Sequence, residues 1–267
     1  EVDFAPVDEK GFVDVEALGA LIRPDTTLIS IMAVNNEIGS VQPIEAISKL
    51  LADKPTISFH VDAVQALAKI PTEKYLTERV DFATFSSHKF HGVRGVGFVY
   101  IKSGKKITPL LTGGGQERDY RSTTENVAGI AATAKALRLS MEKLDIFRSK
   151  TGQMKSVIRQ ALLDYPDIFV FSDEEDFAPH ILTFGIKGVR GEVIVHAFED
   201  YDIFISTTSA CSSKAGKPAG TLIAMGVDKD KAQSAVRLSL DLENDMSQVE
   251  QFLTKLKLIY NQTRKVR

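Results

Sequence analysis

The sequence predicts an α/β fold in which helices sandwich a mostly parallel sheet, followed by a smaller α+β domain. In the first half, short β-rich apolar runs alternate with segments of helical spacing, which is typical of βαβ units in a parallel sheet. After a glycine-rich segment at 112–126 the period changes, and two long helical segments follow each other directly. Hydrophobic residues make up 43% and charged residues 25% of the 267 residues, which excludes disordered, collagen-like and coiled-coil classes.

The first half supplies the elements of the large sheet. Residues 14–22 have the apolar spacing of a helix, and Pro43 is expected to open a second helix. Apolar β-rich runs predict four strands, at residues 26–34, 56–63, 80–86 and 95–102. We therefore assign residues 1–134 to a large domain.

The second half predicts a smaller domain at residues 135–267. It begins with helical segments that run to residue 144 and then to about residue 163. The later elements are short strands at 180–186, 202–206 and 235–240, and helices at 192–200, 221–226 and 246–262. Two consecutive long helices followed by an α+β segment place the domain change near residue 135.

Charge and cysteine content limit the partners and the compartment. With 33 basic and 35 acidic residues the formal net charge is −2, so no strong field attracts nucleic acid or an anionic membrane. A single cysteine excludes an intrachain disulfide framework and a cysteine-rich zinc site. The apolar stretch at 28–34 is too short to span a bilayer, and the start is unlike a signal peptide. We expect a cytoplasmic protein with no direct nucleic-acid or membrane partner.

Three sets of polar residues follow predicted strands, where ligands bind in open α/β sheets. In chain order they are the run Asn35, Asn36 and Glu37, the pair Asp62 and Gln65, and the run Ser86, Ser87, His88 and Lys89. Any one set is explained by the helix caps and turns that such residues form. Together they match the requirements of one cofactor.

Pyridoxal 5′-phosphate (PLP) needs a lysine for a Schiff base and a carboxylate that keeps its pyridine nitrogen protonated. It also needs a hydrogen bond to its phenolic oxygen and donors for its phosphate. Lys89, Asp62 and Gln65 supply the first three groups in turn, and Ser86 with His88 supplies phosphate donors. A lysine after a strand is also typical of a solvated surface, so the residue types alone leave both interpretations open.

Two residues of the second half carry further hypotheses. Cys211 lies among small hydroxylated residues, unlike the apolar segments that hold buried cysteines, and we expect an exposed, mobile thiol. Arg237 lies inside an apolar strand, where an unpaired guanidinium is costly. It therefore needs an anionic partner, either a protein carboxylate or a substrate carboxylate.

No metal site and no dinucleotide site is predicted. His60, His88 and His91 belong to no HExxH pattern and to no Cys/His pairing, so we interpret them as hydrogen-bonded packing residues. The glycines of residues 92–97 resemble a dinucleotide-binding fingerprint but lead into a strand rather than a helix.

Seven motifs resemble, in this order, the cysteine desulfurases of the NifS/IscS-like group within the class V aminotransferase family of PLP enzymes. They are VNNEIGSVQPI, FHVDAVQ, FSSHKFHGVRGVGFVYI, GGGQERDYRSTTEN, the PHILTF…GVRGEV stretch, SACSS and VRLSL. The resemblance covers nearly the whole chain. It implies the fold of the fold-type I PLP enzymes, a homodimer, PLP as cofactor and L-cysteine as substrate.

The resemblance also implies a role for each candidate residue. Lys89 is the Schiff-base lysine and the base at the substrate Cα, and Cys211 is the nucleophile that forms a persulfide. Arg237, with Asn36, binds the substrate carboxylate. The remaining cofactor contacts are implied for Asn36, Asp62, Gln65, Ser86, His88 and, in the other subunit of a dimer, Thr124. L-cysteine would become L-alanine, and the sulfur would pass to an acceptor protein for iron–sulfur cluster assembly or tRNA thiolation.

The chain departs from the family pattern in two respects. Members carry, before these motifs, a segment with a glycine–threonine phosphate loop and a histidine that stacks on the pyridine ring. This chain lacks both, so we expect it to be the C-terminal portion of a desulfurase and to bind PLP weakly or not at all. In addition, Asp119, Thr123 and Thr208 stand where glycine is usual, and each restricts the backbone near Thr124 or Cys211.

Two alternative functions stay open at this point. One is a related PLP lyase or aminotransferase that acts on another amino acid, against which Cys211 in SACSS argues. The other is a catalytically silent dimerisation or partner-binding module.

Overall fold

The structure, a computed structural model, describes residues 1–208 and 220–265. By its contacts the chain divides into two compact units. Unit 1 comprises Glu1–Ile22, Val34–Pro43 and Asp145–Arg267, and unit 2 comprises Arg23–Ala33 and Ile44–Leu144. The domain boundary predicted between residues 134 and 135 stays a prediction.

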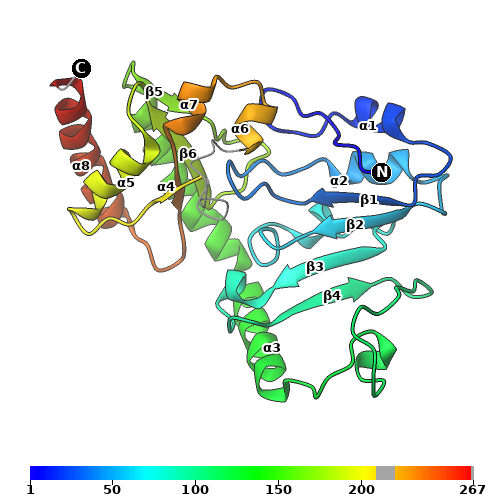
Figure 1. Cartoon of the computed structure of the whole chain (residues 1–267). Helices are drawn as coiled ribbons and strands as arrows, with labels where there is room; N and C mark the ends of the chain where they lie inside the picture. The colour runs from blue at the N-terminus through cyan, green and yellow to red at the C-terminus, as the bar shows by residue number, and fades with distance from the viewer. Residues whose placement is uncertain (209–219, 266–267) are drawn as a thin grey trace. The chain divides into compact units, whose positions relative to one another are not determined.

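Unit 2 is built on a four-stranded sheet with the order β1–β2–β3–β4 (Figure 1). The strands are β1 (Leu28–Met32), β2 (Ser58–Asp62), β3 (Phe82–Ser86) and β4 (Gly97–Ile101). Strands β1, β2 and β3 are parallel, and β4 is antiparallel to β3. The predicted mostly parallel sheet is thus confirmed, and each of its four predicted strands is present.

Helices and short turns connect these strands. Unit 2 contains α2 (Ile44–Leu50), α3 (Val127–Glu142) and the short 3-10 helices η1 (Thr72–Lys74), η2 (Ser87–Phe90) and η3 (Glu117–Asp119). Single helices were expected between the strands, but no α-helix joins β2 to β3. Residues 63–70 form hydrogen-bonded turns there, and Ala68 has a left-handed φ of 59°, which stops a helix from continuing.

A buried carboxylate ties the starts of β2 and β3 together. Asp81 is 1% exposed and accepts a hydrogen bond from the backbone N–H of Phe59 at 2.9 Å. Its oxygens also form ion pairs with Arg79 at 2.8 Å and with Lys105 at 3.2 Å. A buried charge is stable only when it is paired, so the stability of this part of the fold depends on Asp81, Arg79 and Lys105 together.

Unit 1 contains a second sheet, with the order β5–β6–β8–β7 and antiparallel pairing throughout. Its strands are β5 (Ile168–Val170), β6 (Ile181–Ile186), β7 (Ser206–Thr207) and β8 (Ala235–Ser239). The helices of the unit are α1 (Val15–Leu21), α4 (Leu144–Leu163), α5 (Gly191–Glu199), α6 (Gly220–Ala224), α7 (Lys229–Gln233) and α8 (Met246–Lys265). Strand residues Phe184 and Val236 and helix residues Ile158, Phe198 and Phe252 belong to one buried core.

Unit 1 differs from the sequence prediction at three short elements. The strand expected at 202–206 is reduced to β7, and Ile203 and Ile205 pack against the core outside any strand. Asp202 has a left-handed φ of 58°, which interrupts an extended chain. Strand β5 and helix α7 were not predicted, because each is too short to show a clear hydrophobic period.

Candidate functional site

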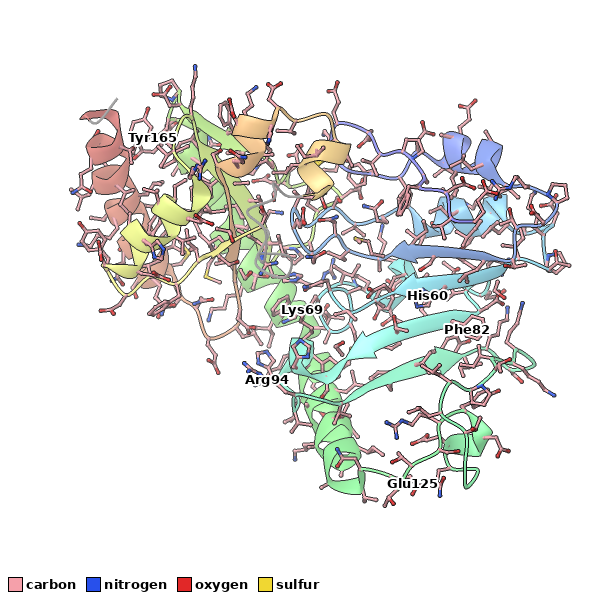
Figure 2. All side chains as sticks on the ribbon, in the orientation of Figure 1. His60, Lys69, Phe82, Arg94, Glu125 and Tyr165 are labelled. Atoms are coloured by element: carbon pink, nitrogen blue, oxygen red, sulfur yellow. The ribbon has the colours of Figure 1, made fainter. Side chains whose placement is uncertain are left out.

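The carboxyl ends of the parallel strands bring two predicted residues to one edge of the sheet in unit 2. Asp62 ends β2 and Ser86 ends β3. Asp62 is in register with Thr84, so Asp62, Thr84 and Ser86 share one face of the sheet. Figure 2 shows Arg94, an exposed cation that the sequence analysis did not select, at this edge.

Asp62 is held in one orientation by its own turn. Its Oδ1 accepts a hydrogen bond from the backbone N–H of Val64 at 3.0 Å. A carboxylate has acceptor capacity for several donors, so the group keeps room for a donor from a ligand. Gln65 lies in the same turn and, like Asp62, is half-buried.

His60 lies on the same face of β2, in the strand interior (Figure 2). Its Nδ1 is 2.7 Å from Ser30 Oγ on β1, and its Nε2 is 3.1 Å from Thr84 Oγ1 on β3. Burial lowers the pKa of His60, while the Asp62 carboxylate acts in the opposite direction. His60 is therefore hydrogen-bonded as expected from the sequence, and it also lies within the electrostatic reach of Asp62.

The turn that carries Lys89 is anchored by two buried residues. In η2, Ser87 and Phe90 point inward: the Ser87 Oγ lies 2.9 Å from Thr133 Oγ1 on α3, and the Phe90 carbonyl accepts from Ser140 Oγ at 3.1 Å. The intervening His88 is exposed and Lys89 is half-buried. The motif thus presents His88 and Lys89 at the surface from a fixed backbone.

The end of this turn requires a glycine. His91 adopts a left-handed φ of 64° and ends η2. At Gly92 a Cβ atom would lie 1.9 Å from Ser87 Oγ, a distance that no side chain tolerates. The Gly92 backbone therefore packs directly against Ser87, and its N–H donates to the Ser87 carbonyl oxygen at 2.9 Å.

The donor set of this edge fits PLP. Among the residues that the structure describes, no hydrogen bond or ion pair engages the Lys89 ammonium. This cofactor needs a free lysine and a carboxylate acceptor, which Lys89 and Asp62 provide. It also needs polar donors, which the Gln65 amide, the Ser86 hydroxyl and the His88 imidazole provide. Each comes from unit 2.

Thr124 is not brought to this set within the chain. It is exposed in the loop before α3, and Figure 2 shows its neighbour Glu125 well apart from Arg94. Its predicted contact with the cofactor of another subunit stays a prediction. Nearby, Asp119 occupies a left-handed conformation with φ of 67°, a conformation that glycine adopts without strain.

The substrate-binding candidates of unit 1 contact each other. Arg237 on β8 donates from Nη1 to the carbonyl oxygen of Asn36 at 2.7 Å. The neighbouring Asn35 is buried and turns the chain here, because its Oδ1 accepts from the N–H groups of Glu37 and Ile38 at 2.8 and 3.0 Å. The local turn at Asn35 thus presents the Asn36 carbonyl to the guanidinium.

Cys211 lies outside the described residues. Within the described part of the chain, no cluster of three or more histidine, cysteine, aspartate or glutamate side chains has the geometry for a metal ion. In the same part, no helix combines the length and the apolar character that crossing a membrane requires.

Comparisons with known proteins agree with the fold and the motif order. The Aminotransferase class-V family model matches residues 1–252. A NifS/IcsS protein homolog of Lactobacillus delbrueckii subsp. bulgaricus is 50% identical over 262 residues, 98% of this chain and 68% of that protein. The cysteine desulfurase IscS of Clostridium botulinum is 37% identical over 269 residues, 100% of this chain and 67% of that protein.

A solved structure supports the same assignment. The structure of a NifS-like protein matches with a TM-score of 0.88 and 37% identity, covering 98% of this chain and 68% of its own. The chain thus spans about two thirds of the length of the relatives that it matches. The resemblance seen in the motifs is confirmed: this chain belongs to the class V aminotransferase family and, within it, to the NifS/IscS group of cysteine desulfurases.

Proposed function

We propose that this protein is a PLP-dependent cysteine desulfurase that converts L-cysteine to L-alanine and holds the released sulfur as a persulfide on Cys211. The observation that carries the proposal is the position of Lys89. It is half-buried, has no described partner, and lies in the turn that follows β3, at the edge of the sheet where Asp62 and Ser86 also lie. Family membership supports the same chemistry.

Unit 2 would hold the cofactor. When bound, PLP supplies a ring that withdraws electrons from the substrate. Asp62, oriented by the Val64 N–H, keeps a proton at the pyridine nitrogen. Ser86 and His88 donate to the phosphate, and Gln65 donates near the phenolic oxygen. Lys89 anchors the cofactor and moves the proton at the substrate Cα.

Asn36, Arg237 and Cys211 have the substrate-side roles. Asn36 is also proposed to contact the phenolic oxygen, and Arg237 binds the substrate carboxylate, for which a guanidinium offers two parallel donors. The Cys211 thiolate attacks the substrate sulfur, an S–S bond forms and the substrate C–S bond breaks. L-cysteine and a protein thiol thus become L-alanine and a protein persulfide, so atoms and electrons balance without an external oxidant.

The remaining assignments follow from the family pattern. We propose a cytoplasmic homodimer in which Thr124 donates to the phosphate of the other subunit. An acceptor protein then takes the sulfur for iron–sulfur cluster assembly or tRNA thiolation. The net charge of −2 supports a protein acceptor rather than direct contact with nucleic acid.

The test of the cofactor site is borohydride reduction of the PLP-treated full-length parent protein, followed by peptide mapping. We expect the reduced cofactor on Lys89 and none in the Lys89→Arg variant. Label on another lysine of the wild-type protein would overturn the assignment of Lys89.

The test of the sulfur chemistry separates this function from a PLP lyase or aminotransferase. Cys211→Ser should abolish persulfide formation and leave the cofactor absorption intact, because the thiol acts on the bound substrate. Full turnover of L-cysteine by Cys211→Ser would remove Cys211 from the mechanism.

Asp62→Ala should weaken both cofactor binding and turnover, because an unprotonated pyridine is a poor electron sink.

A further inference from the structure

We propose that Glu37 is a positioning residue for the sulfur-transfer step. Its carboxylate holds Thr221 in α6, the helix that follows, in the sequence, the segment 209–219 with Cys211. The inference rests on the proposed function and deepens it, because it gives a role to a residue of the first polar set that the family resemblance leaves without one.

The first turn of α6 is held by residues that lie far away in the sequence. The backbone N–H of Thr221 donates to Glu37 Oε2 at 3.2 Å, and Asn35 Nδ2 donates to Thr221 Oγ1 at 3.1 Å. The first N–H groups of a helix have no partner within the helix. The residue before Gly220 in the sequence is an alanine, which has no side-chain oxygen to accept from them. Glu37 and Asn35 therefore supply the cap that the local sequence lacks.

The same turn, residues 35–38, also holds the guanidinium that we propose to bind the substrate carboxylate. Arg237 Nη1 donates to the carbonyl oxygen of Asn36 at 2.7 Å, and the carbonyl oxygen of Glu37 accepts from Thr183 Oγ1 at 2.5 Å. Thr183 on β6 and Arg237 on β8 are register partners, so neighbouring positions of one sheet hold this turn. All of these residues belong to unit 1. One turn thus connects Arg237 to the start of α6.

Both flanks of the segment 209–219 are attached beside this arginine. On the preceding flank, Ser206 of β7 is the register partner of Arg237. On the following flank, Thr221 is linked to Arg237 through the turn that contains Glu37. The pairing of β7 uses backbone groups, which any sequence has, whereas the second attachment depends on the side chain of Glu37.

The Glu37 carboxylate can be removed without displacing Arg237. The guanidinium contacts the backbone carbonyl of Asn36, and a change of the Glu37 side chain leaves that group in place. Leu222 is fully buried in the same apolar cluster as Ile38, so α6 keeps its packing on the turn. Loss of the carboxylate should therefore change the position of the first turn of α6 and leave the fold intact.

This separation predicts different effects on substrate binding and on sulfur transfer. Binding through Arg237 does not use the Glu37 carboxylate, so KM should change little. Cys211 lies ten residues before Thr221, so the approach of its thiolate to the substrate sulfur depends on where Thr221 is held. Loss of a hydrogen bond to a charged acceptor changes an equilibrium by roughly tenfold, and misplacement of a reacting group costs at least as much in rate.

The first measurement is amide hydrogen exchange of Thr221 in the 267-residue chain, which needs no cofactor. We expect exchange to be about tenfold faster in Glu37→Ala than in wild type, because the N–H loses its acceptor. Glu37→Gln keeps an oxygen that can accept and should stay close to wild type. Glu192→Ala removes an exposed acidic residue from the first turn of α5 and is the matched control, with exchange as in wild type. Equal exchange in Glu37→Ala and wild type would overturn the attachment through Glu37.

The second measurement is persulfide formation from L-cysteine by the full-length parent protein. We expect Glu37→Ala to lower kcat about tenfold with KM within about twofold of wild type, and Glu37→Gln to restore kcat. An unchanged kcat, or a loss of kcat accompanied by an equal rise in KM, would overturn the positioning role. Absence of persulfide in the wild-type parent would instead contradict the proposed function, and exchange at Thr221 would still decide whether Glu37 holds α6.

Discussion

Lys155 on α4 is a buried cation outside the proposed site, and its removal should stabilise the protein at neutral pH. The residue is 2% exposed, its Nζ donates to the carbonyl of Ala178 at 3.0 Å, and the ammonium lies 5.5 Å from the centre of the Phe177 ring. Burial lowers the pKa of Lys155 from 10.5 to about 8, and the nearby Arg159 adds to the effect. The acidic groups Glu174 and Asp173 offset only part of it.

The size of the effect follows from this difference in pKa. A shift of about 2.5 units, at about 1.4 kcal/mol each, means that protonated Lys155 costs about 3 kcal/mol of folding free energy at pH 7. Lys155→Met removes this cost and also removes the hydrogen bond to Ala178, which contributes about 1 kcal/mol. We expect a net increase of about 2 kcal/mol in the free energy of unfolding at pH 7.

The pH dependence provides a sharper test than the single value. The native pKa lies below the unfolded one, so between about pH 8 and pH 10.5 the unfolded wild-type chain holds a proton that the native protein has released. Wild-type stability therefore rises with pH in this window relative to Lys155→Met, and the advantage of the variant disappears near pH 10.

The assay is denaturant unfolding of both proteins at pH 7 and pH 10, with Lys257→Met on the exposed face of α8 as control. The control should change stability by less than about 0.5 kcal/mol at either pH, because its ammonium is solvated. A difference between wild type and Lys155→Met that is the same at both pH values would refute the reasoning.

Three further substitutions test the frame of the sheet and the site. Asp81→Asn leaves the largely buried Arg79 without its counter-ion and should cost about 3–5 kcal/mol of unfolding free energy. Burial alone would raise the pKa of Asp81, but its hydrogen bonds and cations lower it. The loss should therefore be present above about pH 4 and shrink as the pH falls further, in denaturant unfolding at several pH values. Asn126→Ala removes the side-chain cap of α3 and should cost about 1 kcal/mol, with Asn126→Ser close to wild type in thermal unfolding. Gly92→Ala brings a methyl group onto Ser87 Oγ and should both destabilise the protein and lower its affinity for PLP, measured by absorption titration; unchanged affinity would show that the turn tolerates displacement.

The sequence predicted all four strands of unit 2, and the apolar runs of β1, β2 and β3 include buried positions, whereas β4 is exposed along most of its length. Ile29, Phe59 and Phe85 are each less than 9% exposed. The antiparallel direction of β4 was not predicted, since an apolar run does not show whether a strand is parallel or antiparallel to its neighbour. A signal for it was present: residues 87–96 are too few for the crossover of a dozen or more residues that a parallel neighbour needs.

A short apolar run indicates burial, and it does not indicate pairing. The run at 202–206 has three consecutive apolar residues, of which Ile203 and Ile205 pack against the core of unit 1 and Phe204 is exposed. Pairing is confined to Ser206 and Thr207, which are in register with Arg237 and Val236. A contact with a partner strand depends on distant residues, and a local pattern carries no information about it.

The candidate site shows the same distinction between residue type and position. Lys89, Asp62 and Ser86 were selected because polar residues at the ends of parallel strands share one edge, which follows from topology alone. Ser87 was taken together with them, yet its side chain points inward and bonds to Thr133. Ser87 lies three residues before the buried Phe90 in η2, and residues three apart fall on the same side of a 3-10 helix.

The hydrogen-bond partners of His60 could not be predicted from the sequence motif in which it lies. As one of several scattered histidines it was assigned a packing role, and its hydrogen bonds agree with that. Its position relative to Asp62, on the same face of one strand, was already visible in FHVDAVQ. What only the structure could supply is the pair of hydroxyls from β1 and β3, because strand order and register determine which residues flank a ring. The two hydrogen-bond partners of His60 therefore lie 30 and 24 residues away from it in the sequence, beyond the reach of any local pattern.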